Sequence, residues 1–465
     1  MSFKNIIVIF VCIVFSTSAW GTVFVEWNEA TLPPPTLLGL KQIVVAWERD
    51  SAAALLATAR KQGYSVFVET PLKQAASAAK GCAEQTCAGI FLSVLESENA
   101  EAEKSIASLQ SAYPQLPVRI LSPGKQPKMR GSFIIKHNSV LEVSSPTAQP
   151  WVDTNLAIIR VEHRSHRPQT PLYTFSWSDQ NAPPTLTADD YSLAIAETGA
   201  FHADLVLQLD EHLQQGLNKH DGPAWALWNQ VRSILTFSAD AGSKILQPAA
   251  NVAVIMDQLD PGDEVLNLLS RHNIPFQVFT AADLKTADLK GFDVVIVLAK
   301  SDAETADRIK NLATVGAIVV VVDAHGKYSW QSSQPVQVNE HTTSYAAGNG
   351  KILELAEPVS DPETFAQDIR RLLGNQNSLL SLWNGLTTIA VPYKGRGSGI
   401  SLLEFVNYAG EPVRLQVQVK GSFTSIRYET PEHGCCQNLD PVKHDGFTEF
   451  VIPDLRIAGR IHLEP

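Results

Sequence analysis

Acidic side chains end or follow several apolar runs in the first half of the chain. They are Glu26, Glu48, Glu69, Glu96, Asp179, Asp210 and Glu211. If these runs are parallel strands of one barrel, their carboxyl ends meet at one mouth, where the active site of such a barrel lies. Glycoside hydrolysis requires two carboxyl groups that face each other across a sugar. The competing interpretation is that each acid caps the helix after its strand, because caps occupy the same positions.

Tryptophans accompany these acids and could stack on sugar rings, because an indole presents a large apolar face. Those at or near the ends of the apolar runs are Trp27, Trp47, Trp151 and Trp177. From position and chemistry we predict Glu96 as general acid/base and Asp179 as nucleophile or stabiliser. We predict Trp47, Trp177 and Glu48 as substrate-binding residues. No metal or cofactor is expected at this site.

The apolar runs that must position these residues number eight and are rich in β-branched side chains. They span 22–28, 42–48, 65–71, 88–94, 118–123, 139–145, 172–178 and 203–210. Helical patterns separate most of them, and "DSAAALLATARKQG" (50–63) is the clearest, with a polar cap, a leucine and alanine stripe and a final glycine. Strands that alternate with helices require parallel crossovers, which fit either an open sheet or a (β/α)8 barrel. We therefore predict an irregular (β/α)8-like barrel over 22–247.

A tighter alternation of strands and helices follows, and it predicts a flavodoxin-like doubly wound domain over 248–378. The runs "VVIVLA" and "AIVVVVDA" are continuously apolar, as in strands buried on both faces, and the amphipathic "ETADRIKNLATVG" joins them. "IMDQLDPGDEV" lacks the glycines of a dinucleotide site, and "AAGNGKI" lacks the leading glycine and final hydroxyl of a phosphate-binding loop. No cysteine lies between Cys87 and Cys435 to act as a nucleophile. We interpret this domain as a packing or interface module.

From 379 to 465 the hydrophobic period changes to two, and glycine, proline and asparagine interrupt the runs. Segments such as "PVRLQVQVKGS" and "GFTEFVIPDL" alternate apolar and polar residues, the pattern of strands with one buried face. We predict a small antiparallel β-sandwich over this range.

The composition is that of a globular protein with several domains. The 465 residues include 45% hydrophobic and 18% charged residues, and this length favours two to three domains. The net charge of −11 argues against nucleic acid and anionic membrane surfaces as partners. Lys4, an apolar stretch over 6–15 and the small-residue segment "STSAWG" predict a signal peptide over 1–21. We expect a periplasmic or secreted protein without a membrane span after cleavage.

Cysteines and histidines offer further candidate sites. The mature chain would keep Cys82, Cys87, Cys435 and Cys436. The first two flank a short loop and could pair, whereas the adjacent pair would need a strained vicinal bridge. Zinc is the alternative, but two such pairs in different domains lack the spacing of a zinc site. In "HRSHRP" (163–168), His163 and His166 could bind a metal or phosphate, although a solvated basic turn is the favoured interpretation.

Two segments carry a resemblance to a known family. "KGFDVVIVLAKSDAETADRIKNLATVGAIVVVVD" resembles the trimerisation domain of multidomain glycoside hydrolases of the β-galactosidase type. That domain is related to class I glutamine amidotransferases but lacks the nucleophile. "SLLEFVNYAGEPVRLQVQVKGSFTSIRYETPE" resembles their small C-terminal sandwich. The resemblance implies a TIM-barrel-like first domain, a carbohydrate substrate or ligand, and a homo-oligomer formed through the middle domain.

The first domain departs from the pattern of this family. Such enzymes carry an Asn-Glu pair after the fourth strand and a second Glu after the seventh. Here the fourth run ends "SVLESEN", which places Glu96 without a preceding asparagine, and the seventh ends "SWSDQN", with Asp179 instead. Two hypotheses follow. Either the protein hydrolyses glycosidic bonds with these different acids, or it is a catalytically inactive hydrolase-like protein that binds glycans or assembles in the cell envelope.

Overall fold

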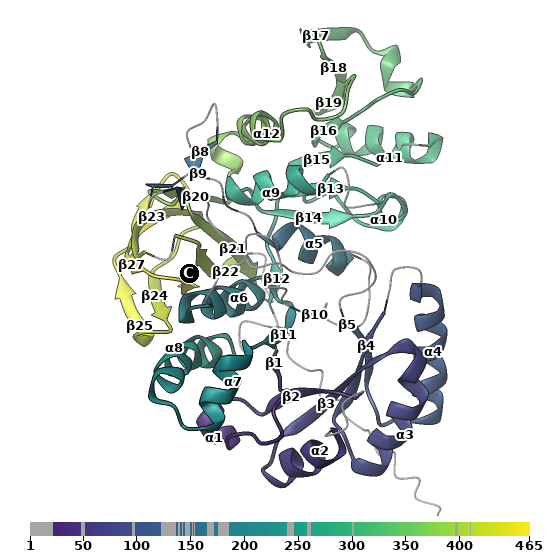
Figure 1. Cartoon of the computed structure of the whole chain (residues 1–465). Helices are drawn as coiled ribbons and strands as arrows, with labels where there is room; N and C mark the ends of the chain where they lie inside the picture. The colour runs from purple at the N-terminus through teal and green to yellow at the C-terminus, as the bar shows by residue number, and fades with distance from the viewer. Residues whose placement is uncertain are drawn as a thin grey trace, which may run out of the picture.

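The computed structural model describes residues 22–47, 52–94, 98–121, 136–137, 140–141, 143–144, 149–150, 152, 154–164, 172–174, 186–239, 246–257, 262–299, 302–395, 399–409 and 411–465. The predicted signal peptide lies outside these residues. The three largest regions of the fold are built on a parallel sheet, a mixed sheet and a pair of antiparallel sheets (Figure 1). Among the described residues, no helix has both the length and the hydrophobicity that a bilayer span requires.

Seven parallel strands of the first domain form one sheet, in the order β10-β11-β1-β2-β3-β4-β5. They are β1 (Val23–Glu26), β2 (Gln42–Ala46), β3 (Ser65–Pro71), β4 (Gly89–Ser93), β5 (Val118–Leu121), β10 (Leu172–Thr174) and β11 (Asp204–Gln208). Although β5 and β11 lie far apart in this order, Nη1 of Arg119 on β5 donates to Oδ2 of Asp204 on β11 at 2.8 Å. The sheet therefore curls until β5 lies beside β10. This barrel confirms the predicted fold class.

The inside of the barrel is filled by side chains, with one from each strand in a single apolar layer. The layer consists of Phe24, Val44, Phe67, Phe91, Leu121, Leu172 and Val206. The rings of Phe67 and Phe91 stack at 4.9 Å, and Phe24 contacts both edge-on. Because residues two apart on a strand share a face, this layer identifies which side chains point into the barrel above and below it.

One of the eight predicted barrel strands is wrong. The run at 139–145 was expected to be the sixth strand, but its described residues form β7 (Val140–Leu141) and β8 (Val143–Ser144) in two small hairpins. Their partners are β6 (Lys136–His137) and β9 (Gln149–Pro150). Two-residue strands are too short to span the barrel layer, so the described barrel has seven strands.

Helices cover the outside of the barrel (Figure 1). They are α1 (Pro35–Leu38), α2 (Ala52–Lys61), α3 (Ala75–Gln85), α4 (Asn99–Ala112), α6 (Ala188–Phe201), α7 (Glu211–Asn218) and α8 (Gly222–Ser238). The predicted helix at 50–63 is confirmed as α2, which buries Leu55, Leu56 and Ala59. A further helix, α5 (Leu156–Arg164), lies between two domains: Leu156 and Ile159 join the core of the barrel domain, and Ala157 and Val161 join that of the middle domain.

The middle domain is a seven-stranded sheet with helices on both faces. Its elements are β13 (Val252–Ile255), α9 (Asp263–Arg271), β14 (Phe276–Phe279), α10 (Ala281–Thr286), β15 (Val294–Val297), α11 (Ala303–Thr314), β16 (Ile318–Val321), β17 (Pro335–Asn339), β18 (Thr342–Ala347), β19 (Gly350–Leu355) and α12 (Pro362–Asn377). The parallel strands run β14-β13-β15-β16-β19, which is the 2-1-3-4-5 order of flavodoxin. Every residue of β13 and β15 is buried, as the continuous apolar runs predict.

Two antiparallel sheets form the C-terminal sandwich, one of six strands and one of four. Its strands are β12 (Gln247–Pro248), β20 (Leu380–Trp383), β21 (Thr388–Lys394), β22 (Ile400–Asn407), β23 (Val413–Lys420), β24 (Ser425–Thr430), β25 (Gly434–Leu439), β26 (Val442–His444), β27 (Phe447–Leu455) and β28 (Ala458–Glu464). The boundary predicted between 247 and 248 falls inside β12, which pairs with β21.

The sandwich is joined to the barrel domain through its six-stranded sheet. The outer face of this sheet adds Val391, Tyr393 and Val406 to the core of the barrel domain. In the "VNY" segment, Tyr408 donates its hydroxyl hydrogen to Oε1 of buried Glu197 on α6, at 2.8 Å. The same carboxylate accepts a hydrogen bond from Nδ2 of Asn155 at 2.6 Å. This segment of the sequence therefore anchors the sandwich to the barrel.

Candidate active site

The carboxyl ends of the barrel strands carry a set of inward polar side chains, which we call the polar mouth. It consists of Glu26 on β1, Glu69 on β3, Ser93 on β4 and Gln208 on β11. Each residue lies two positions after a member of the apolar layer and so shares its inward face. Gln208 donates from Nε2 to Oε2 of Glu26 at 2.8 Å, and the Ser93 hydroxyl donates to Oε1 of Glu69.

Two glutamates from different strands therefore contribute to one mouth. Glu26 is 9% exposed and Glu69 is half-buried, so both carboxylates are largely shielded from bulk water. Between them, β2 presents the small side chain of Ala46 on the inner face. A carboxylate has about four acceptor positions, and Gln208 donates to one on Glu26 while Ser93 donates to one on Glu69. The polar mouth thus presents donor and acceptor groups of the kind that hydrogen-bond hydroxyl groups.

The described acids outside the mouth have other roles. Asp210 is the N-cap of α7 and accepts hydrogen bonds from the backbone N–H groups of His212 and Leu213. Glu211 lies in the first turn of α7 and accepts a hydrogen bond from Gln215. The capping interpretation is correct for Asp210, whereas Glu211 is a first-turn acid of the same helix. An acid at the end of a strand can either cap the next helix or line the mouth of the barrel. The direction in which its side chain points from the strand, inward or outward, distinguishes these two roles.

Most of the predicted site residues lie outside the described residues. Glu96 comes three residues after the end of β4 and Asp179 five residues after the end of β10. Trp177, Trp151 and Glu48 also lie outside, in the segments that follow β10, precede α5 and follow β2. Loops after parallel barrel strands emerge at the mouth, so the predicted acids belong to segments that begin there.

The two described tryptophans of the prediction both pack on the outer side of the barrel. Trp27 is fully buried and donates from Nε1 to the carbonyl oxygen of Thr31 at 2.7 Å, so it cannot stack on a sugar. Trp47 is half-buried, and its indole packs against Gly81 of α3. Only an exposed part of the Trp47 ring is left for contact with a ligand.

The contact between Trp47 and Gly81 provides a stability test. A Cβ atom at Gly81 would lie 2.3 Å from Cη2 of the indole, so Gly81→Ala should overpack the site and destabilise the protein by about 1–3 kcal/mol. Gly222→Ala, at the start of α8 with no neighbouring atom within 4 Å, is the matched control and should be close to neutral. Urea denaturation of both variants measures the difference. Equal midpoints would show that Trp47 does not pack as described.

The first residue of the histidine motif at 163–168, His163, does not lie in a solvated turn. His163 lies on α5, and its Nε2 is 3.1 Å from the carbonyl oxygen of His202, to which a neutral ring can donate. Burial, with a contribution from Arg160, lowers the pKa of His163 to about 3. The interpretation as an exposed basic turn is therefore wrong for His163, and His166 lies outside the described residues. The ring is a neutral packing group.

Solved structures of similar fold span nearly the whole chain. An α-L-fucosidase (isoenzyme 2) from Paenibacillus thiaminolyticus is 12% identical, with a TM-score of 0.59, over 95% of this chain and 99% of its own. A GH42 β-galactosidase from G. stearothermophilus is 8% identical, with a TM-score of 0.59, over 96% of this chain and 99% of its own. The chain has a glycoside hydrolase-like fold.

The glycoside hydrolase-like fold confirms the resemblance that the middle and C-terminal segments indicated. The likeness includes the succession of a barrel and β-rich domains, since almost the full length of each neighbour is matched. No protein-family profile and no curated protein sequence matches the chain. At 8–12% identity the likeness establishes the fold alone.

Proposed function

We propose that this protein is an exported enzyme that hydrolyses glycosidic bonds at the polar mouth of its barrel. The observation that supports the proposal is the presence of Glu26 and Glu69 on one inner face, with polar hydrogen-bond partners and a small residue between them. The fold neighbours include a fucosidase and a β-galactosidase, which points to a saccharide as the ligand. Export is part of the proposal and is based on the predicted signal peptide.

In this proposal the mouth and its loops have separate roles. Glu26 and Glu69 hydrogen-bond the hydroxyl groups of the sugar. Their places on strands β1 and β3 hold the two carboxylates in fixed positions. Glu96, after β4, is the general acid/base, and Asp179, after β10, is the nucleophile or stabiliser. Glu96 would protonate the leaving oxygen as the glycosidic C–O bond breaks, and Asp179 would stabilise the sugar cation or bond to its anomeric carbon. Water would then add to that carbon, displacing Asp179 where it had bonded, and would return a proton to Glu96.

The substrate-binding residues complete the proposed site. Trp177 and Glu48 would contact the sugar from the loops after β10 and β2. Trp47 would contribute the exposed part of its ring, while the rest stays packed against Gly81. Binding through several weak contacts of this kind is expected of a ligand that presents both hydroxyl groups and apolar faces.

A panel of aryl glycosides and oligosaccharides tests the proposal. The purified chain should release product from at least one glycoside, and it should bind the same sugar in calorimetry. Sugar binding without hydrolysis would favour the alternative, a catalytically inactive glycan-binding protein of the envelope. Neither binding nor hydrolysis across β-galactosides, α-fucosides and envelope polysaccharides would contradict both. Secretion of a fusion carrying residues 1–30 tests the export component separately.

A further inference from the structure

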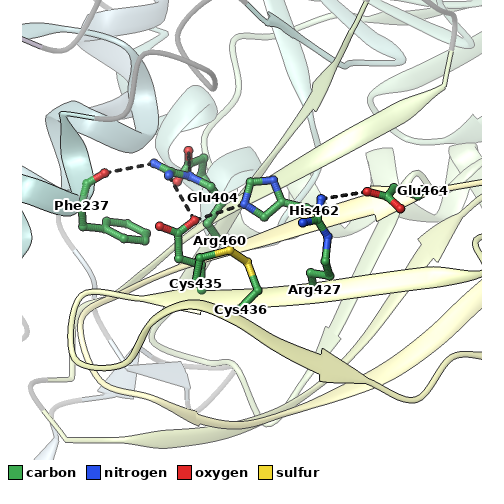
Figure 2. A network of polar contacts seen from close by, with 9 residues as sticks. Phe237, Glu404, Arg427, Cys435, Cys436, Arg460, His462 and Glu464 are labelled. Atoms are coloured by element: carbon green, nitrogen blue, oxygen red, sulfur yellow. Dashed lines mark hydrogen bonds and ion pairs between the residues drawn. A yellow bond between two sulfur atoms is a disulfide. The ribbon is translucent and has the colours of Figure 1, made fainter.

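Three potential metal ligands meet on the outer face of the six-stranded sandwich sheet. They belong to the C-terminal domain, whereas the polar mouth belongs to the barrel domain. Glu429 on β24, Cys436 on β25 and His462 on β28 each offer one ligand atom, and these atoms all lie within 4.8 Å of one another. The arrangement follows from the sheet, because β24 pairs with both β25 and β28. Figure 2 shows His462 beside the two adjacent cysteines.

The distance between the nitrogen and oxygen ligands of this cluster is close to that around a tetrahedral ion. Nε2 of His462 and Oε2 of Glu429 are 3.1 Å apart. Nitrogen and oxygen ligands at about 2.0–2.1 Å from a tetrahedral zinc ion would be roughly 3.3 Å apart. Zinc accepts thiolate, imidazole and carboxylate ligands together, and three protein ligands leave a fourth position for water. All three side chains are half-buried, which allows an ion to enter.

Charged side chains of both signs surround the cluster. Arg460 approaches Oε2 of Glu429 at 3.5 Å, but it forms its shorter contact, 2.8 Å, with buried Glu404. Arg427 pairs with Glu464 at 2.8 Å. Glu404 and Glu464 take the shorter contacts of the two arginines. Glu429, which Arg460 also approaches, and a cysteine thiolate would supply the negative charge for a divalent ion.

The oxidation state of Cys436 decides whether the cluster can bind. In the structure its Sγ atom is joined to that of Cys435 in a vicinal disulfide (Figure 2). The thiolate, not a disulfide sulfur, is the metal ligand. We propose that Glu429, Cys436 and His462 form a zinc site that is closed by the Cys435–Cys436 disulfide and opened by its reduction.

The reaction is a two-electron exchange followed by metal binding. A dithiol reductant supplies two electrons and two protons; the Cys435–Cys436 S–S bond breaks, two S–H groups form, and the reductant becomes a disulfide. Zn²⁺ then replaces the thiol proton of Cys436, which is released to water. Reoxidation by a disulfide oxidant reverses both steps and expels the ion.

Cobalt is the probe for this site, because its thiolate complexes absorb in the near ultraviolet and visible range. The full chain is reduced with a phosphine under nitrogen, freed of reductant and titrated with Co²⁺. The reduced protein should bind one Co²⁺ with thiolate-to-cobalt absorption that Zn²⁺ displaces, and the oxidised protein should not. Cys435→Ser, which removes the disulfide but keeps Cys436, should bind with or without reductant.

Matched variants assign the ligands. Cys436→Ser should lose the thiolate absorption, and His462→Gln should weaken Co²⁺ binding by on the order of 10- to 100-fold or more. Cys87→Ser, at the other cysteine pair, should bind like the reduced wild type. The proposal is overturned if the reduced wild type, folded by circular dichroism, binds no Co²⁺, or if binding survives unchanged in both Cys436→Ser and His462→Gln.

Discussion

Glu96→Gln and Asp179→Asn should each lower kcat/KM by about 10²- to 10⁴-fold on the glycoside that the wild type cleaves. The amide keeps the size of the side chain but removes the proton donor at Glu96 and the negative charge at Asp179. Both effects act on the transition state, so the loss should appear in kcat as well as in kcat/KM. Steady-state kinetics on the purified variants measures it.

Variants of the mouth itself should behave differently from variants of the two catalytic acids. Glu26→Gln and Glu69→Gln remove charged hydrogen-bond acceptors worth about 1.5–3 kcal/mol each, which corresponds to roughly a 10- to 100-fold loss of sugar binding. This loss should appear mainly in KM.

Glu98→Gln, two residues after Glu96, is the control for the two catalytic acids and should keep wild-type kinetics. Full activity in both Glu96→Gln and Asp179→Asn would refute their proposed roles.

Glu404→Gln should destabilise the protein by about 3–5 kcal/mol, because it leaves the Arg460 guanidinium buried without its main partner. The side chains of Arg460 and Glu404 are 3% and 4% exposed, and Nε and Oε1 are 2.8 Å apart. Arg460 also lies 4.4 Å from the ring centroid of Phe237 on α8, so this ion pair joins the sandwich to the barrel (Figure 2). Urea denaturation followed by tryptophan fluorescence measures the change.

An exposed ion pair on the same sheet gives the control for Glu404→Gln. Arg427 and Glu464 are also 2.8 Å apart, but their side chains are 41% and 55% exposed. Glu464→Gln should therefore cost at most about 1 kcal/mol. Replacing the buried pair together, by Glu404→Leu with Arg460→Met, should recover most of the lost stability because no charge is left buried. A cost below about 1 kcal/mol for Glu404→Gln alone would contradict this account of the junction.

Much of the fold could be predicted from hydrophobic period. Continuous apolar runs gave the buried middle strands β15 and β16, and period-two alternation gave the sandwich strands β23 and β27. The run at 139–145 failed because alternation over a few residues fits a short hairpin as well as a barrel strand. The hydrophobic pattern of a short segment does not determine which other strand it pairs with.

The candidate site was harder to predict than the fold. The acids Glu26 and Glu69 were found by their place at strand ends, but Ser93 and Gln208 were missed because neutral residues gave no chemical signal. Ser93 and Gln208 could have been identified from their spacing, because each lies two residues after an inward apolar residue, Phe91 or Val206. The Cys436 cluster could not be predicted, because its histidine and glutamate come from strands whose pairing is long-range.

The crystal structure of the full chain with a bound iminosugar, a cationic mimic of the glycosidic transition state, tests the central claim most directly. We predict that the sugar ring lies at the carboxyl ends of the barrel strands, with Glu26 and Glu69 within hydrogen-bond distance of its hydroxyl groups. An iminosugar bound elsewhere on the molecule, with the mouth free of sugar, would contradict the claim.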